Sequence, residues 1–152
     1  MKNQNTFTYN NVQDSIPKAT AGTGTITNAN NNLLIGVGTK FKTEAKEGDY
    51  IYIKTQNDFR LIENIVSDTE LVISTAFGSA LSGVAYDITP NPKYTQVTIE
   101  AVTGAPDIDG VALANGKELS FEKNEHGVGS DYVLPIDVDA TSSRVANVQV
   151  VS

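Results

Sequence analysis

Two pairs of aspartates are the residues whose spacing most readily suggests chemistry. Asp107 and Asp109 lie in the segment PDIDG, and Asp137 and Asp139 lie in PIDVD. Side chains at positions i and i+2 of a strand share one face, so each pair could present two carboxylates on one surface. Such a pair could serve a glycoside hydrolase, which needs carboxylates about 5–9.5 Å apart. It could also supply part of a calcium site, which takes roughly six to eight oxygen ligands.

A structural interpretation of the same aspartates is the one that we favour. In DIDG, an aspartate would cap its own backbone while Gly110 adopts a positive φ, which is typical of a turn. In PIDVD, Asp137 and Asp139 would lie on a solvated strand face or at a strand end. The sequence therefore predicts no catalytic residue, no metal ligand and no cofactor-binding residue.

A single histidine, His126, lies in the segment KNEHGVGS. A catalytic histidine needs a nucleophile and an orienting acid around it. Ser130 and Glu125 are close in sequence, but Gly127 and Gly129 indicate a flexible loop. We therefore expect a loop histidine rather than a general base.

The glycine- and asparagine-rich stretch GTGTITNANNNLLIGVGTKF could be taken for a phosphate-binding loop. Its glycines match two of the three positions of a dinucleotide fingerprint, and no Gly-Lys-Ser/Thr follows as in a P-loop. No helix is expected after it to bind a phosphate at its N-terminus. Apolar residues flank the asparagines on both sides, so the pattern predicts a hairpin. We expect strands at 23–27 and 33–38 and a tip at 28–32, where Asn and Gly tolerate a positive φ.

Alternating tyrosines, Tyr50 and Tyr52, could stack on a sugar. The chain has no tryptophan, and packing in a core or at a sheet edge is the interpretation that we favour. An RNA-stacking platform would need basic neighbours, and only Lys54 and Arg60 are close in sequence.

The composition narrows the partner classes. The 152-residue chain has a net charge of −7 and no cysteine. An acidic chain without a basic cluster is repelled by nucleic acids and anionic membranes, so we expect neither as a partner. The absence of cysteine excludes disulfides and thiolate metal sites. No segment has the apolar pattern of a signal peptide or a membrane span, so neither is expected.

Short runs rich in Val, Ile, Thr and Tyr alternate with turn signals, which predicts an all-β chain. The segment TPNPK breaks strand pairing and is the best boundary between two units. Beyond it, YTQVTIEAV alternates cleanly, as in a sheet that is wetted on one face. We predict an N-terminal arm at 1–19, a small antiparallel β-barrel at 20–89 and a second antiparallel, sandwich-like β unit at 93–152. One larger sandwich is the alternative. Pro135 indicates a strand edge or a bulge.

Residues 22–89 carry a series of landmarks in a fixed order. A Gly-Thr-Gly-Thr-Ile-Thr opening and a polar tip precede GVGTKF, then KEGD before an apolar strand, then IENIVSDTELVIS and a closing GVAYDIT. This order resembles the small β-barrel module of tailed-bacteriophage virion proteins. The later stretch VTIEAVTGAPDIDGVALANGKELSF looks like another phage structural β module.

The resemblance implies a virion structural protein rather than an enzyme. We expect an auxiliary capsid protein, of the decoration or stabilising kind, that is made in the host cytoplasm and incorporated in the virion. Its partners would be the major capsid protein or other virion proteins, with many copies or a homo-oligomer in the particle. The arm at 1–19 would make inter-subunit contacts. Alternatives are a receptor- or glycan-binding module of a fibre or tail, using Tyr50 or Tyr52, and a neck or tail connector component.

Overall fold

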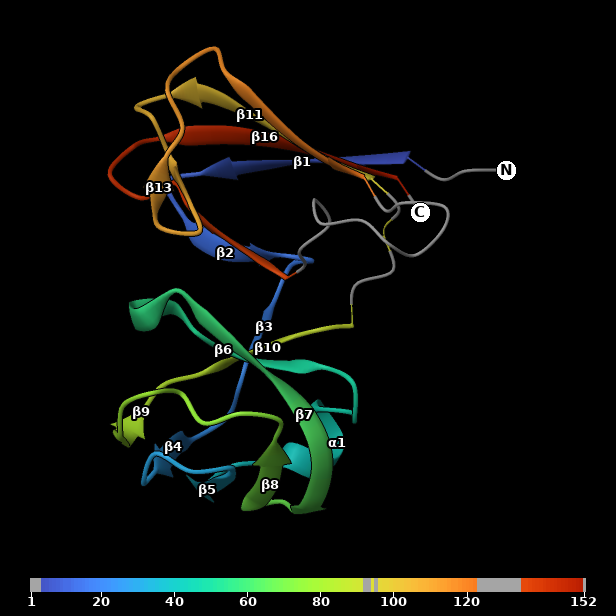
Figure 1. The fold of residues 1–152 in the computed structure, drawn as a ribbon, viewed down its shortest axis with the longest axis vertical. Helices are drawn as coiled ribbons and strands as arrows, with labels where there is room; N and C mark the ends of the chain where they lie inside the picture. The colour runs from blue at the N-terminus through green and yellow to red at the C-terminus, as the bar shows by residue number, and fades with distance from the viewer. Residues whose placement is uncertain (1–3, 92–93, 95, 123–134, 152) are drawn as a thin grey trace. The chain divides into compact units, whose positions relative to one another are not determined.

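The chain folds into two compact β units (Figure 1), and the computed structural model describes residues 4–91, 94, 96–122 and 135–151. Unit 1 combines residues 1–16 with 92–152, and unit 2 is residues 17–91. The prediction of an all-β fold is confirmed, since the helices of the described residues are α1 (Phe41–Glu44) and the 3-10 turn η1 (Lys54–Gln56). None of these helices is long and apolar enough to cross a membrane.

Unit 2 is a closed antiparallel barrel. Its sheet has the order β3-β10-β6-β7-β8-β5-β4-β9. Here β3 and β4 are successive parts of one stretch of chain, and β9 and β10 are successive parts of another. Since β3 pairs with β10 and β4 with β9, the two ends of the sheet meet in one ladder. The strands are β3 (Thr20–Ala21), β4 (Thr25–Asn28), β5 (Leu33–Val37), β6 (Tyr50–Ile53), β7 (Asp58–Ser67), β8 (Glu70–Ile73), β9 (Leu81–Val84) and β10 (Asp87–Thr89).

The barrel interior follows from the two-residue period of its strands. In β5, Leu34 and Gly36 are buried, whereas Leu33, Ile35 and Val37 are exposed. Gly36 is required because a Cβ there would overlap the side chain of Thr39. Inward-facing aliphatic and aromatic side chains from the other strands, from α1 and from the β9–β10 connection complete one core, which includes Ile26, Leu34, Phe41, Ile51, Ile53, Ile62, Leu71, Ile73, Leu81, Tyr86 and Ile88.

The hairpin predicted in the glycine- and asparagine-rich stretch is confirmed. Strands β4 and β5 pair antiparallel, with Thr25 opposite Val37 and Thr27 opposite Ile35. The tip lies between them, and Asn30 adopts a positive φ of 63°. Phosphate-loop geometry is therefore absent from this stretch, which builds two adjacent strands of the barrel.

Gly22→Ala is expected to destabilise unit 2 by about 1–2 kcal/mol through overpacking. A Cβ at this position would overlap the ring of Tyr86, which is 3% exposed. The ring cannot swing away freely, because its hydroxyl donates a hydrogen bond of 2.8 Å to the carbonyl of Thr23. Urea unfolding followed by the NMR amide signals of unit 2 measures the loss. The matched control Ser82→Ala, at an exposed position of β9, should change stability by less than about 0.5 kcal/mol; an equally small change for Gly22→Ala would contradict the close packing.

Unit 1 is a sandwich of two antiparallel sheets. The first sheet has the order β1-β16-β11-β14 and the second β13-β12-β15-β2. The strands are β1 (Gln4–Asn10), β2 (Gln13–Ile16), β11 (Gln96–Thr103), β12 (Asp107–Ile108), β13 (Val111–Ala112), β14 (Glu118–Glu122), β15 (Ile136–Asp139) and β16 (Val145–Val151). Both sheets contribute to one buried core, formed by Tyr9, Ile16, Val97, Ile99, Ala101, Ile108, Leu113, Ile136, Val138, Ala140, Ala146, Val148 and Val150.

The predicted N-terminal arm at 1–19 is wrong, because residues 4–16 are an integral part of unit 1 and residues 17–19 already belong to unit 2. Strand β1 pairs with β16 along its whole length, and β2 pairs with β15. Tyr9 is 1% exposed and its hydroxyl donates a hydrogen bond of 2.7 Å to the carbonyl of Ser15. Unit 1 is therefore discontinuous in sequence, and unit 2 is inserted between its second strand and its third.

The boundaries predicted for the two later units are close to those observed. Unit 2 begins at residue 17 rather than 20, and its end at 91 falls within the TPNPK segment. Pro135 immediately precedes β15 rather than lying inside a strand. The preceding residues of the strand predicted there, 131–134, lie outside the described residues.

Candidate functional site

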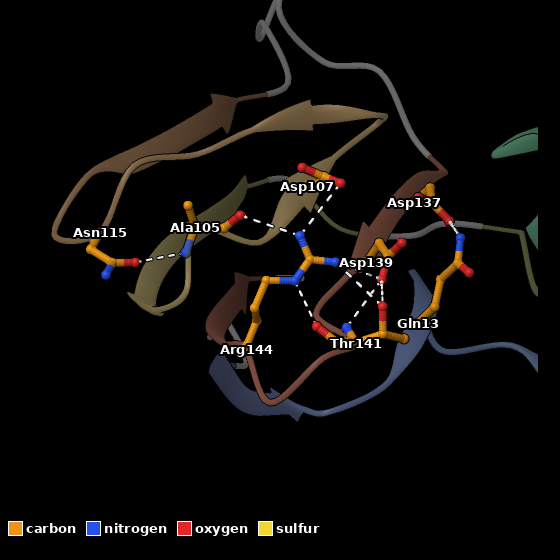
Figure 2. A network of polar contacts seen from close by, with 8 residues as sticks. All are labelled: Gln13, Ala105, Asp107, Asn115, Asp137, Asp139, Thr141 and Arg144. Atoms are coloured by element: carbon orange, nitrogen blue, oxygen red, sulfur yellow. Dashed lines mark hydrogen bonds and ion pairs between the residues drawn. The ribbon is translucent and has the colours of Figure 1, made fainter.

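The aspartates that suggested chemistry come together across the β12–β15 ladder, in an arrangement that sequence spacing did not predict. Asp107 lies directly opposite Asp139. Both carboxylates face the guanidinium group of Arg144, whose nitrogens lie 3.1 Å from Asp139 and 3.5 Å from Asp107 (Figure 2). One cation therefore neutralises one member of each predicted pair.

Arg144 ties the loop after β15 to the turn before β12. Its Nε donates a hydrogen bond of 2.6 Å to the carbonyl of Thr141, and a terminal nitrogen donates a longer one of 3.4 Å to the carbonyl of Ala105. Gly104 makes room for this arrangement, since a Cβ there would overlap the aliphatic stem of Arg144. The turn is held in its own right by the side chain of Asn115, which accepts a hydrogen bond of 2.8 Å from the Ala105 amide.

The pKa of Asp139 reflects two opposing influences. Partial burial disfavours the charged carboxylate and raises the pKa. Hydrogen bonds from the hydroxyl and amide of Thr141, together with the charge of Arg144, outweigh burial, so the net shift is downward. The carboxylate is therefore held in its charged form, which suits an ion pair and not a general acid.

Unit 1 is expected to lose stability in acid partly through Asp139. A carboxyl group whose pKa is lowered by folding adds stability above its unfolded pKa of about 3.9, and that contribution is lost as the pH falls through the folded pKa. The wild type should therefore lose more stability than Asp139→Asn between about pH 5 and pH 2.5. Urea midpoints of unit 1 across this range, followed by NMR, measure the difference. Parallel pH profiles for the two proteins would contradict this role of Asp139.

The other two aspartates are also engaged within unit 1. Asp137 is fully buried and accepts a hydrogen bond of 2.9 Å from the side-chain amide of Gln13. Asp109 accepts one of 2.9 Å from the backbone amide of Asp137. Partial burial of its carboxyl group raises the pKa of Asp109, and this hydrogen bond opposes the rise. The predicted DIDG turn is confirmed, with φ of 50° at Asp109 and 82° at Gly110, but Asp109 caps the neighbouring strand and not its own backbone.

The contacts of the four aspartates stabilise the sandwich, and their arrangement is poorly suited to catalysis. The two members of each i, i+2 pair bind different partners, because Asp137 is buried against Gln13 while Asp139 is paired with Arg144. In the described part of the chain, no three His, Asp or Glu residues are grouped so that they could bind a metal ion. His126, with Glu125 and Ser130, lies outside the described residues.

The tyrosines considered for sugar stacking are differently placed. Tyr52 is fully buried, and its ring stacks on Phe59 with 4.5 Å between the centroids and an interplanar angle of 10°. Tyr50 is only partly buried. The pair therefore cannot act together as an exposed aromatic platform.

Sequence reasoning missed two features of unit 1. Arg144 lies five residues after Asp139 but far in sequence from Asp107, and its spacing does not indicate that one guanidinium group pairs with both. The outward face of the first sheet carries polar side chains on all four strands, whereas the sequence showed only the alternation within single strands, such as Gln96, Thr98 and Glu100 on one side of β11. Strands β1 and β16 form the rest of this face. The pairing of β16 with β1 and with β11 joins residues that are far apart in the sequence.

The fold and these contacts define a two-unit all-β protein, a small barrel inserted into a sandwich, whose acidic cluster has a structural role. No family model, curated protein or solved structure matches the chain.

Proposed function

We propose that the chain is a structural protein of a tailed-bacteriophage particle, an auxiliary capsid protein that binds the particle through protein–protein contacts. The partners proposed are the major capsid protein or other virion proteins, and many copies would be present in each particle. A neck or tail position is the alternative location. The observation that carries the proposal is the ordered series of landmarks in residues 22–89, which resembles the barrel module of phage virion proteins.

The landmark residues have fold-determining roles, which explains why they occur in this order. In GVGTKF and SDT, the hydroxyl of Thr39 donates to the carbonyl of Asp68, and the Asp68 carboxylate accepts a hydrogen bond of 3.0 Å from the Lys42 amide. In KEGD, Asp49 accepts a hydrogen bond of 3.0 Å from the amide of Lys46. The landmark residues thus join β5, α1 and the β7–β8 turn, as expected for a module whose fold depends on them.

The remaining support is chemical. The aspartates singled out by spacing are engaged in hydrogen bonds and ion pairs within unit 1. A protein that functions by association needs complementary surfaces and a stable frame rather than a reactive constellation. Two all-β units in which these aspartates are held by internal contacts fit that requirement.

Binding to particles tests the proposal directly. Particles of the phage that encodes the chain, prepared after deletion of its gene, should bind the purified protein and carry it through a sucrose gradient. Bound copies should appear in electron-microscopy maps at symmetry-related positions. Failure to co-sediment at any salt concentration, together with absence of the chain from wild-type particles by mass spectrometry, would overturn the proposal.

A further inference from the structure

The outward face of the sheet β1-β16-β11-β14 is an ordered array of uncharged polar side chains. In its central row, the strand register places Thr6, Gln149, Thr98 and Ser120 side by side across all four strands. Gln96 and Asn147 flank this row on the two central strands. We call these six residues the polar face.

Several hydrogen-bonding groups of the polar face have no partner within the described chain. The side-chain amides of Gln149 and Gln96 are in half-buried residues of the central strands, yet neither makes a hydrogen bond in the part of the chain that the structure describes. Thr98 and Ser120 share one weak contact of 3.4 Å between their hydroxyls. These amide groups are accessible to water, so a ligand that offers matching donors and acceptors can replace the water at them.

The polar face is hollowed rather than flat. Two depressions of about 290 Å³ each lie over the sheet, and Thr98 and Gln149 line both of them. The depressions therefore adjoin one another in the middle of the face. Adjoining depressions suit an extended ligand made of repeated units.

We propose that the polar face binds a neutral glycan. Amide and hydroxyl groups provide donors and acceptors side by side, which is what a polyhydroxylated ligand requires. The polar face carries no lysine or arginine, and Glu100 and Glu118 lie beside it, so anionic ligands are disfavoured. Tryptophan, tyrosine and arginine, which dominate the binding energy of protein–protein interfaces, are also absent from it.

The affinity expected of one face is low. No aromatic ring of the polar face can stack on a sugar, so hydrogen bonds must supply the binding energy, and a dissociation constant of about 1 mM is expected. Display of many copies would raise the overall avidity. This inference stands on the sandwich alone and does not depend on the proposed role in a phage particle.

The test uses the whole ¹⁵N-labelled protein and a panel of neutral oligosaccharides with common hexoses, 6-deoxyhexoses and N-acetylhexosamines in α and β linkages. At least one of them should shift the NMR signals of the polar face, including the side-chain amides of Gln149 and Gln96. Sulfated and sialylated oligosaccharides of equal length should bind more weakly. Envelope-type and storage-type neutral polysaccharides in the same panel distinguish the source of the glycan.

Variants connect the signal to the polar face. Gln149→Leu with Thr98→Val should weaken binding at least about tenfold while the remaining spectrum stays that of a folded protein. Gln56→Leu in unit 2 is the matched control, since among the described residues the side chain of Gln56 makes only a 3.4 Å contact with Ser79, and this variant should bind as the wild type does. The inference is overturned if no neutral saccharide shifts these signals, if the shifts map elsewhere, or if the polar face responds only to dilution, which would indicate self-association.

Discussion

Asn28→Asp is expected to destabilise unit 2 by about 3 kcal/mol at neutral pH, although the change is nearly isosteric. Asn28 is 2% exposed, and its side-chain nitrogen donates hydrogen bonds of 2.6 Å to the carbonyl of Leu33 and 2.9 Å to that of Asn31. In the aspartate variant a charged oxygen would face both carbonyl oxygens. The hydrogen bonds to these carbonyls would be lost, together with a longer one of 3.3 Å to the side-chain oxygen of Asn31, and one oxygen of the buried carboxylate would lack a donor.

The direction of the pH dependence distinguishes this mechanism from a general loss of packing. The other side-chain atom of Asn28, Oδ1, accepts from the amides of Asn30 at 3.0 Å and Asn31 at 3.3 Å, and aspartate can keep these bonds. Once it is protonated, the introduced carboxyl group can also donate one hydrogen bond, so the destabilisation should shrink as the pH falls toward 4. Urea unfolding of unit 2 at several pH values, followed by NMR, measures the effect.

Asn64→Asp is the matched control, because Asn64 lies exposed on β7 and its substitution adds the same charge at the surface of the same barrel. It should change stability by less than about 0.5 kcal/mol. Equal losses for the two variants would mean that charge alone, and not the buried donor, explains the effect.

The hairpin illustrates what local sequence can predict. Its two strands and its tip were expected within one or two residues, because apolar residues flank a run of turn-forming asparagines. The reason given for those asparagines holds only for Asn30, which has the positive φ. Asn28 closes the tip with its side chain, and Asn32 donates 3.1 Å hydrogen bonds to the carbonyls of Ile73 and Ser74, far away in sequence.

The N-terminal residues illustrate what local sequence cannot predict. Phe7 and Tyr9 alternate as in a strand, but the surrounding Gln, Asn and Thr residues hide that signal. The partner strand β16 lies at the other end of the chain, where Tyr9 meets Ala146. The polar composition of the N-terminal residues therefore favoured the prediction of an arm. In the structure, the first and last strands pair with each other and are neighbours in one sheet.

The acidic cluster was found by spacing but misjudged in geometry. The sequence pattern grouped Asp137 with Asp139, because residues at positions i and i+2 share a strand face. In the structure, Asp139 instead lies opposite Asp107 in the β12–β15 ladder. Sequence gives no register between β12 and β15, so neither this pairing nor its counter-ion Arg144 could be foreseen. The structural role favoured for these aspartates agrees with the contacts observed.

Arg144→Met is expected to destabilise unit 1 by about 2–3 kcal/mol, somewhat less than the loss of one partner from a fully buried ion pair. The Arg144 side chain is 18% exposed, and those of Asp139 and Asp107 are 26% and 34% exposed. Methionine keeps most of the aliphatic stem that packs against Gly104, so the loss would come from the guanidinium group. Urea unfolding followed by the amide signals of unit 1 measures it, while the signals of unit 2 report whether the effect is local.

A double-mutant cycle shows whether the cation acts through Asp139. If it does, Arg144→Met should cost less in an Asp139→Asn background than in the wild type, because the neutral amide no longer needs a counter-ion. Lys117→Met, at an exposed position before β14, is the control for losing a positive charge from this acidic chain and should have an effect below about 0.5 kcal/mol. Additive effects of the two substitutions would contradict the coupling. Strong coupling would mean that Asp139, one of the aspartates whose spacing resembles a catalytic pair, has a structural role. Its carboxylate would be held by the positive charge of Arg144, which fastens the loop after β15 to the opposite side of the ladder.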